Sequence, residues 1–466
     1  MATQLTLGDE LVSPDTVDTS IVRPHDGEDG RKPLVSPFRP IHYLGSKLRL
    51  ADEIRAAVNQ VDPGRGRMLD LFSGSGSVSG YLGQERPITA VDVQEYSRVI
   101  CAAILRPRPY SYSFLSALVD QAGESEQARS MWWAFRPLIE HEAKCREAAR
   151  GGDLYGLCHL IEQGALIASD GGNGAEQSPE LGEACARARE RLDYVGLASS
   201  PMTAISRYYG GVYFSYEQAL RLDVLTTTAH SYEDAIKDTL VAAILSAASN
   251  AVNTVGKQFA QPLQPRNADG VPKTTLLQKV EADRTKDVRK EFLAAASKIA
   301  NRNMPDLEHI ALRGDYADAF SNFDQEVGVV YADPPYTRDH YSRFYHVLET
   351  IALRDTPELA TMKKSGIEQV TRGIYREERY QSPFCIKSRA PGAFRLLFDC
   401  VSNRNIPLVL SYSPHEKKDG THPRVVSLSN IISIAGEYFG DVSVRDVSGV
   451  AHSYLNHSRR RLESRE

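Results

Sequence analysis

The sequence has few of the features that mark several large classes of protein. No apolar run approaches the length needed to span a membrane, and the N-terminal residues include acids but lack the basic-then-apolar pattern of a secretory signal. The six cysteines lie far apart, without the paired spacing of a zinc site or a disulfide framework. We therefore expect a cytoplasmic protein with free thiols, no bound metal and no membrane contact.

An overall excess of positive charge is also missing. The formal net charge is −5, from 55 Lys and Arg against 60 Asp and Glu. If the partner is a nucleic acid, the basic surface that contacts it must therefore be local. The 466 residues are enough for two or three domains, and the balance of apolar and charged residues is ordinary for a globular protein.

What is present is a short β-branched run that stops abruptly. Residues 329–332 predict a buried central strand of a parallel sheet, and Asp333-Pro334-Pro335-Tyr336 follow directly. The two prolines fix φ and donate no hydrogen bond, so the strand must end there. Asp333 and Tyr336 are thereby held at the carboxyl end of a strand, where open α/β sheets bind their ligands.

This tetrapeptide fits the methylation of an exocyclic amino group. The nitrogen lone pair of such a group is delocalised into an aromatic ring, so hydrogen-bond acceptors must draw the nitrogen toward tetrahedral geometry. Asp333 can accept one N–H and the Pro334 carbonyl the other, while Tyr336 offers a face for a base lifted out of its stack. Asp and Pro are also ordinary turn residues, and a simple strand-ending turn remains the alternative for the tetrapeptide alone.

A second strand and turn lie upstream. Residues 68–72 predict an apolar strand, which a Gly/Ser turn and a helix from about Val78 follow. Glycines let a ligand approach the main chain closely, and the helix N-terminus presents unpaired N–H groups. The next strand, residues 88–92, ends on Asp92, where a carboxylate can bind ribose hydroxyls. Because the turn lacks a P-loop lysine, a ligand with a ribose and no phosphate is favoured.

Around these units the chain divides by composition. Residues 1–35 have too little periodic apolar content for a packed element and predict a disordered tail. Residues 36–100 and 305–466 carry the α/β pattern, including a short strand that ends on Asp315 and another at 407–413. Residues 101–304 predict an inserted, mostly helical region with a capping box at Ser215 and Gln218. Residues 363–390 are polar and basic without a period and predict a flexible loop.

Nucleic-acid contacts have several candidates. The polar stretch 250–262 contains Lys257 and Gln258, which can read base edges or can lie in an exposed loop. After the central strand, Arg338 and Arg343 can touch phosphates or can be solvated charges at the start of a helix. A cluster of aromatic residues before the capping box can stack bases, although clustered aromatics usually pack a core: Tyr208, Tyr209, Tyr213 and Phe214.

The order of these motifs resembles that of the Dam-like, D12-class adenine-N6 DNA methyltransferases, which use S-adenosylmethionine. Tyr-Leu-Gly-Ser-Lys at 43–47 is similar to the N-terminal cofactor motif of that family, residues 70–77 to its Gly-rich motif, and residues 333–336 to its catalytic motif. The long insertion falls where the family places its target-recognition segment. The resemblance implies a Rossmann-like α/β methyltransferase sheet, in 36–100 and 305–466, with a helical target-recognition region inserted at 101–304.

The resemblance also implies roles for individual residues. It places Asp92 at the cofactor ribose, Asp315 beside the cofactor adenine, and Phe72, Gly74 and Gly76 around the methionine part. The full set of expected cofactor contacts is Tyr43, Lys47, Asp70, Phe72, Gly74, Gly76, Asp92 and Asp315, and the catalytic set is Asp333, Pro334, Pro335 and Tyr336. The expected partner is double-stranded DNA, with a cognate restriction endonuclease or defence-system proteins as further candidates. Methylation of RNA or of cytosine N4, and a silent DNA-binding subunit, remain alternatives.

Overall fold

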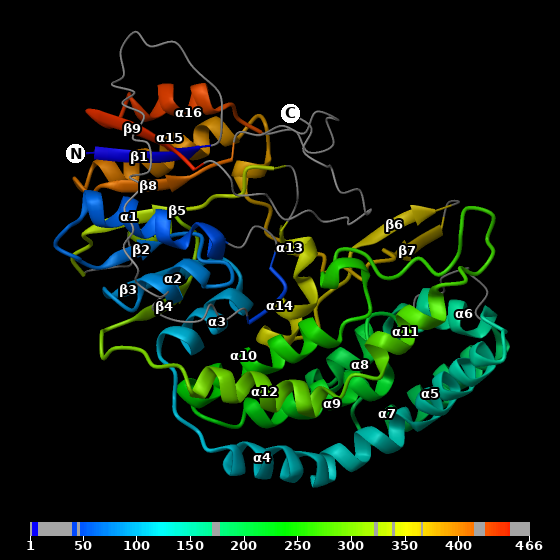
Figure 1. The fold of residues 1–466 in the computed structure, drawn as a ribbon. Coiled ribbons are helices and arrows are strands. Elements are labelled where there is room, and N and C mark those ends of the chain that lie inside the picture. The colour runs from blue at the N-terminus through cyan, green and yellow to red at the C-terminus, as the bar shows by residue number, and fades with distance from the viewer. Residues whose placement is uncertain are drawn as a thin grey trace, which may run out of the picture.

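The computed structural model of the chain describes residues 2–7, 40–43, 47–169, 178–320, 325–337, 341–364, 367–413 and 425–447. Two parts of the molecule stand out in Figure 1, a layered sheet with helices on both faces and a larger body of packed helices. No helix in these ranges is long and apolar enough to cross a membrane.

The sheet is parallel throughout its described strands. Their order is β4 (Ile310–Arg313), β3 (Ile88–Asp92), β2 (Met68–Asp70), β5 (Val329–Ala332), β8 (Leu408–Ser411), β1 (Ala2–Leu7) and β9 (Asp441–Asp446). From the centre, β2, β3 and β4 step in one direction and β5 and β8 in the other, so the topology switches between β2 and β5. The predicted Rossmann-like α/β class is confirmed.

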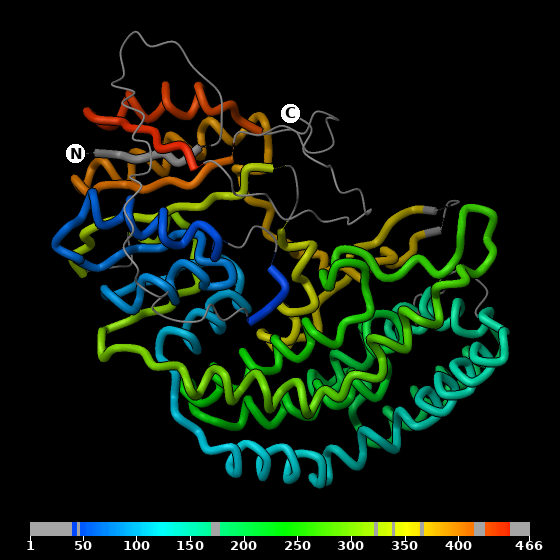
Figure 2. The backbone as a smooth tube through the Cα atoms, viewed as in Figure 1, coloured from blue at the N-terminus to red at the C-terminus, as the bar shows by residue number. Residues whose placement is uncertain are grey.

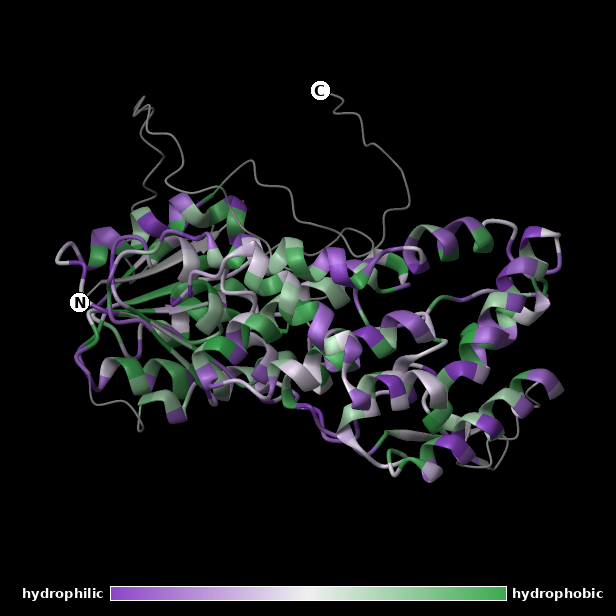
Figure 3. Cartoon of the chain, turned by 90° about the horizontal axis from the view of Figure 1, so that it is seen from below, coloured by the Kyte–Doolittle hydropathy of each residue, from purple (hydrophilic) through white to green (hydrophobic). Residues whose placement is uncertain are grey.

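The predicted central strand is β5, and it is buried along its whole length. Val329 and Tyr331 pack on one face with α1 (Ala51–Val61), α2 (Ser77–Leu82) and α3 (Glu95–Leu105). Val330 and Ala332 pack on the opposite face with α15 (Ala390–Ser402) and α16 (Leu428–Ala435). Because both faces are covered, the strand is apolar at every position, and Figure 3 shows the central strands in the green of hydrophobic residues.

The N-terminal end of the chain differs from the prediction in one respect. Although its composition predicts no packed element, Ala2–Leu7 form β1, whose backbone pairs with β8 on one side and β9 on the other. A strand between two neighbours is held by backbone hydrogen bonds on both edges, which a search for apolar periodicity does not detect. The rest of the predicted tail lies outside the described residues.

The inserted region is helical, as the sequence predicts. Its helices are α4 (Tyr112–Glu124), α5 (Glu126–Arg150), α6 (Tyr155–Gln163), α7 (Pro179–Tyr194), α8 (Ala204–Tyr209), α9 (Tyr216–Ala229), α10 (Asp234–Ala251), α11 (Leu276–Arg284) and α12 (Val288–Ala300), with short 3-10 turns η2 (Leu166–Ser169), η3 (Pro201–Thr203) and η4 (Val255–Lys257). Helix α10, which is buried from Asp238 to Ser249, packs against α3, α9 and α12, and so joins the two parts of the molecule. The predicted domain boundary at residue 100 falls inside α3.

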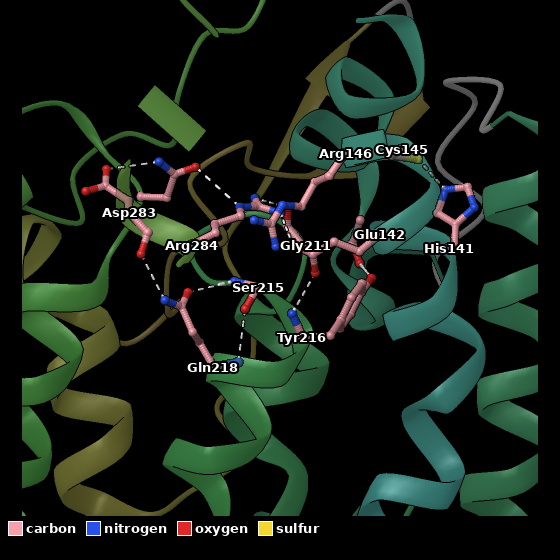
Figure 4. A network of polar contacts seen from close by, with 12 residues as sticks. His141, Glu142, Cys145, Arg146, Gly211, Ser215, Tyr216, Gln218, Asp283 and Arg284 are labelled. Atoms are coloured by element: carbon pink, nitrogen blue, oxygen red, sulfur yellow. Dashed lines mark hydrogen bonds and ion pairs between the residues drawn. The ribbon is translucent and has the colours of Figure 1, made fainter. Parts of the chain in front are cut away.

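A buried polar network holds three of these helices together (Figure 4). The fully buried Arg284 donates to Glu142 Oε1 at 2.7 Å, and Glu142 Oε2 accepts the backbone N–H of Tyr216 at 2.9 Å. The predicted capping box of Ser215 and Gln218 begins α9, and the Gln218 side chain also donates to a backbone carbonyl of α11. Helices α5, α9 and α11 are therefore fixed relative to one another.

The described residues of the stretch 363–390 contain strands and a 3-10 turn, where the sequence predicts a flexible loop. After α13 (Tyr341–Phe344) and α14 (His346–Leu353), β6 (Thr361–Lys364) and β7 (Ile367–Val370) pair as an antiparallel hairpin, and η6 (Pro383–Cys385) leads into α15. Arg372 donates to the Leu263 carbonyl and Tyr213 to the Gly373 carbonyl, so the hairpin lies beside the segment before α11 (Figure 2). Long-range contacts of this kind leave no periodic signal in the sequence.

Candidate active site

A cleft opens at the carboxyl ends of β2, β3, β4 and β5, beside the point where the sheet topology switches. It encloses about 900 Å³ of empty space, part of it continuous with solvent. Nine predicted site residues line it: Tyr43, Lys47, Phe72, Asp92, Asp315, Asp333, Pro334, Pro335 and Tyr336. The fold therefore brings together residues that are up to about three hundred positions apart in sequence, at the edge where α/β sheets bind ligands.

The carboxylate of Asp333 is paired with a lysine. Lys47, on the 3-10 turn η1 (Lys47–Leu50), places Nζ 2.6 Å from Asp333 Oδ2 and 5.6 Å from the centre of the Tyr336 ring. Burial raises the pKa of Asp333, and the Lys47 ammonium opposes this by favouring the ionised carboxylate. The sequence predicts Lys47 as a cofactor contact, whereas the structure places it at the catalytic motif.

Three polar atoms on residues that line the cleft have no hydrogen-bond partner among the described residues. They are Asp333 Oδ1 and the hydroxyls of Ser342 and Ser382. Buried polar groups without a partner are rare in folded proteins because they lose their hydrogen bonds to water. A ligand that donates to Asp333 Oδ1 and bonds to Ser342 would satisfy these two.

Aromatic rings frame the same end of the cleft. Tyr336 packs edge-on against Tyr412, with ring centres 5.3 Å apart, and Tyr341 lines the cleft from α13. Tyr43 stacks on Tyr345 with ring centres 5.0 Å apart and planes 14° from parallel. The arrangement gives a flat ring several apolar faces against which to pack.

Asp92 lies in the cleft at the end of β3. Its Oδ2 accepts the backbone N–H of Gly74 and its Oδ1 that of Gln94, both at 2.9 Å. Burial raises the pKa of Asp92, while these backbone donors favour the charged form. A carboxylate can accept about four hydrogen bonds, so Asp92 keeps acceptor capacity at the edge of the cleft.

The predicted glycines are needed for close packing. Gly74 has φ +51°, and a Cβ there would lie 2.6 Å from the Tyr43 hydroxyl. Gly76 has φ +68°, and a Cβ there would lie 2.5 Å from Ile104 Cδ1. Both positions adopt a left-handed conformation in which no side chain has room. The glycines therefore shape the turn beneath the cleft, and Tyr43 covers Gly74 on the cleft side.

The structure differs from the prediction for Asp70. The sequence places it among the cofactor contacts, but it is 1% exposed and is not among the residues that line the cleft. Its Oδ2 accepts the Ser79 hydroxyl at 2.6 Å, and burial raises its pKa to about 7. Asp70 is thus positioned to hold the start of α2 against β2, because its side chain points into the interior below the Gly-rich turn.

The far end of the cleft is an aromatic slot that the sequence only partly predicts. The Phe72 ring lies 5.6 Å from that of Tyr316 and 5.5 Å from that of Phe384, and Asp315 closes the end of β4. Tyr380, Ser382 and Cys385 also line the slot. These three residues were missed because they lie in the stretch interpreted as a flexible loop, and no motif or period marks them.

A second groove lies on the helical side and contains two of the predicted DNA contacts. Gln258 and Arg343 line it together with exposed amide and basic side chains, among them Gln261, Gln264, Lys273 and Gln278. Helix α13 separates this groove from the cleft, since Tyr341 and Ser342 line the cleft while Arg343 and Phe344 line the groove. Arg338 lies outside the described residues.

Lys257 is used inside the protein, contrary to its prediction as a DNA contact. Its Nζ lies 2.5 Å from Asp283 Oδ1 and donates to the carbonyls of Asn250 and Val252. An ammonium with three internal acceptors has no donor left for a phosphate. The lysine instead holds the turn η4 against α11.

Parts of the sequence match one protein family and two known methylases. Residues 43–131 and 276–375 match the model of the D12 class N6 adenine-specific DNA methyltransferases. The chain is 24% identical over 405 residues to the modification methylase LlaI of Lactococcus lactis subsp. lactis, an alignment that covers 86% of this chain and 49% of that protein. It is 36% identical over 106 residues to the type II methyltransferase M.FokI of Planomicrobium okeanokoites, covering 22% and 15% of the two chains. No solved structure matches the chain. The chain thus spans about half the length of the first of these relatives and a smaller part of the second.

Proposed function

We propose that the chain, whose residues 43–131 and 276–375 match the model of the D12 class N6 adenine-specific DNA methyltransferases, transfers a methyl group from S-adenosylmethionine to N6 of adenine in double-stranded DNA. The observation that carries the proposal is the unpartnered Asp333 Oδ1, which lies in one cleft with Tyr336 and with the paired carboxylate of Asp92.

The cleft fits the proposed cofactor by the chemistry of its donors and acceptors. Asp92 has acceptor positions for the ribose hydroxyls, and the aromatic slot at Phe72 and Tyr316 fits a purine ring. When bound, S-adenosylmethionine supplies an electrophilic methyl group on a sulfonium. These residues hold and orient it, and they leave the Asp333 end of the cleft for the methyl acceptor.

The acceptor end positions an adenine amino group. Asp333 Oδ1 accepts one N–H of that group and the Pro334 carbonyl accepts the other, which draws electron density onto the nitrogen as it loses its conjugation with the ring. Lys47 keeps the carboxylate ionised and therefore able to accept. Tyr336 offers a ring face to the base. Most of the rate then comes from holding the two reactants in line.

An adenine within a duplex cannot reach this cleft, so the base must leave its stack. The groove behind α13 supports this route, because its amide and basic side chains suit base edges and phosphates and because α13 borders both the groove and the cleft. A duplex in the groove would present one nucleotide at the Tyr341 side of α13. On this proposal the helical region, residues 101–304, recognises the target sequence, and a restriction endonuclease that cuts the same sequence is the fitting partner.

The test is methylation of DNA in a host without its own adenine methylation. We expect methylation-sensitive sequencing to show N6-methyladenine in one sequence motif when the wild-type chain is expressed. Asp333→Ala removes the acceptor without touching Asp92, so it should abolish the mark while binding of S-adenosylhomocysteine persists. Retained turnover in this variant would contradict the role given to Asp333.

Nucleoside analysis of the same cells separates the alternatives. N4-methylcytosine in DNA, or a methylated base in RNA alone, would replace the proposed substrate with another. Cofactor binding without methyl transfer to any nucleic acid would identify a silent DNA-binding subunit.

A further inference from the structure

One wall of the aromatic slot is formed by Tyr380, Ser382 and Cys385. These residues lie outside both ranges that match the family, 43–131 and 276–375. Tyr380 Oη donates to Asp315 Oδ2 at 2.6 Å, and Asp315 Oδ1 accepts the backbone N–H of Ala317 at 3.0 Å. Asp315 belongs to the matched part of the chain, whereas Tyr380 follows its last residue, 375. A residue outside the matched ranges therefore orients a carboxylate inside them.

The wall also presents an unused hydroxyl to the slot. Ser382 lines the cleft, and its Oγ is buried without a hydrogen-bond partner among the described residues. The neighbouring polar groups are engaged, since Asp315 is held by Tyr380 and Ala317. A buried hydroxyl that makes no hydrogen bond loses free energy relative to water, and a polar ligand in the slot would restore the bond.

The wall is held in place from two sides. Phe384 is 1% exposed and packs edge-on against Phe394 of α15, with ring centres 4.9 Å apart, and its ring is tilted against that of Tyr316 at 5.2 Å. On the other side, Arg376 binds both carboxylate oxygens of Asp355 at 2.6 Å. Tyr380 and Ser382 lie between these anchors, so they form a preorganised surface.

We propose that Tyr380 and Ser382 form the adenine-reading wall of the methyl-donor site. Asp315, oriented by Tyr380, accepts a hydrogen bond from the 6-amino group, and the Ser382 hydroxyl donates to a ring nitrogen of the purine. The rings of Phe72 and Tyr316 supply the apolar part of the slot, with Phe384 packed against both of them. This inference rests on the proposed function, since it names how the same cofactor site recognises its purine.

The pattern of donors and acceptors discriminates among purines. An amino group at C6 donates to the Asp315 carboxylate, whereas a C6 carbonyl oxygen would meet a second acceptor and be repelled. Tyr380 is a positioning residue in this scheme, because it acts through Asp315. Ser382 touches the purine directly.

The experiment is calorimetric binding of S-adenosylhomocysteine and of its analogue that lacks the 6-amino group. The variants are Tyr380→Phe, which keeps the ring and loses the hydroxyl, and Ser382→Ala. The control is Tyr112→Phe, at a tyrosine that is 64% exposed on α4. We expect each slot variant to weaken binding of S-adenosylhomocysteine about tenfold, as for the loss of one hydrogen bond, while the control binds as the wild type does.

The analogue distinguishes positioning from general loosening of the site. With the 6-amino group absent, Asp315 has nothing to accept, so Tyr380→Phe should change affinity less than about twofold while Ser382→Ala keeps its effect. If both variants bind S-adenosylhomocysteine as tightly as the wild type, the inference is overturned and the proposed function stands. If the wild type itself does not bind, the proposed function fails and this inference fails with it.

Discussion

Replacing Lys47 by methionine tests whether the lysine keeps Asp333 ionised. The substitution keeps an unbranched chain of similar length and removes the ammonium that lies 2.6 Å from Asp333 Oδ2. Burial raises the pKa of this carboxyl, and Lys47 is the group that opposes the rise. Because the carboxylate is the form that accepts the amino N–H, activity is lost as the pH falls through this pKa. Removing the lysine raises the pKa further, so the acid limb of the rate profile must move to higher pH.

The size of the shift in the acid limb follows from the contact between Lys47 and Asp333. A hydrogen bond to a charged group contributes about 1.5–3 kcal/mol when it is largely shielded from water, and both side chains here are less than one-fifth exposed, at 12% and 18%. One pH unit corresponds to about 1.36 kcal/mol. The acid limb should therefore move upward by about one to two pH units, while the rate on the alkaline plateau changes less.

The assay is single-turnover methyl transfer from labelled S-adenosylmethionine to unmethylated plasmid DNA, measured across pH. Lys298→Met, at an exposed lysine on α12, serves as the matched control and should leave the profile unchanged. Binding of S-adenosylhomocysteine to each variant confirms that the cofactor site is intact. An active Lys47→Met variant whose acid limb coincides with that of the wild type would refute the reasoning.

Three further outcomes are expected. Asp92→Ala leaves the Gly74 N–H unpaired and removes the ribose acceptor, so calorimetry should show S-adenosylhomocysteine affinity about 10- to 150-fold weaker, and unchanged affinity would exclude this role. Gly76→Ala should lower the free energy of unfolding by about 2–5 kcal/mol in urea denaturation, from a left-handed conformation and a clash. Gly196→Ala, at a similar φ of +70° but with no atom within 4 Å, should cost only about 1–2 kcal/mol, and equal losses would contradict the clash. Arg284→Met should cost about 3–5 kcal/mol in the same assay because it leaves the buried Glu142 carboxylate unpaired, and a loss below about 1 kcal/mol would argue against the ion pair.

The parts of the site that were predictable are those set by local backbone rules. Pro334 and Pro335 end a strand wherever it lies in the fold. The apolar run before them therefore predicts a buried strand that ends at Asp333. Asp92 is a similar case, because the spacing between a Gly-rich turn and the next strand end is fixed by one helix and two loops. Strands β3 and β5 accordingly lie where the sequence predicts them.

The parts that could not be predicted depend on contacts across the fold. Lys47 and Asp333 are 286 positions apart, and nothing local in either segment shows that they meet. Tyr380 and Ser382 lie in a polar stretch without a period, and only the packing of Phe384 places them on the slot. Lys257 is predicted as a DNA contact because it lies in a polar stretch whose side chains can read base edges, whereas Asp283 holds it in the interior.

The neighbouring strands β2 and β5 carry a consequence for how the chain reaches its native state. Leu69 pairs with Val330, and about 260 residues separate these two partners in the sequence. Nearly all of the helical body lies within that interval. During synthesis on the ribosome, β2 and β3 emerge long before β5 is made. The edge of β2 that pairs with β5 therefore stays unpaired until then. The helices between them pack against one another and can fold first, which shortens the distance that β5 must close. Refolding of the whole chain should therefore be slow and sensitive to aggregation, with the helical region acquiring its structure before the sheet is complete.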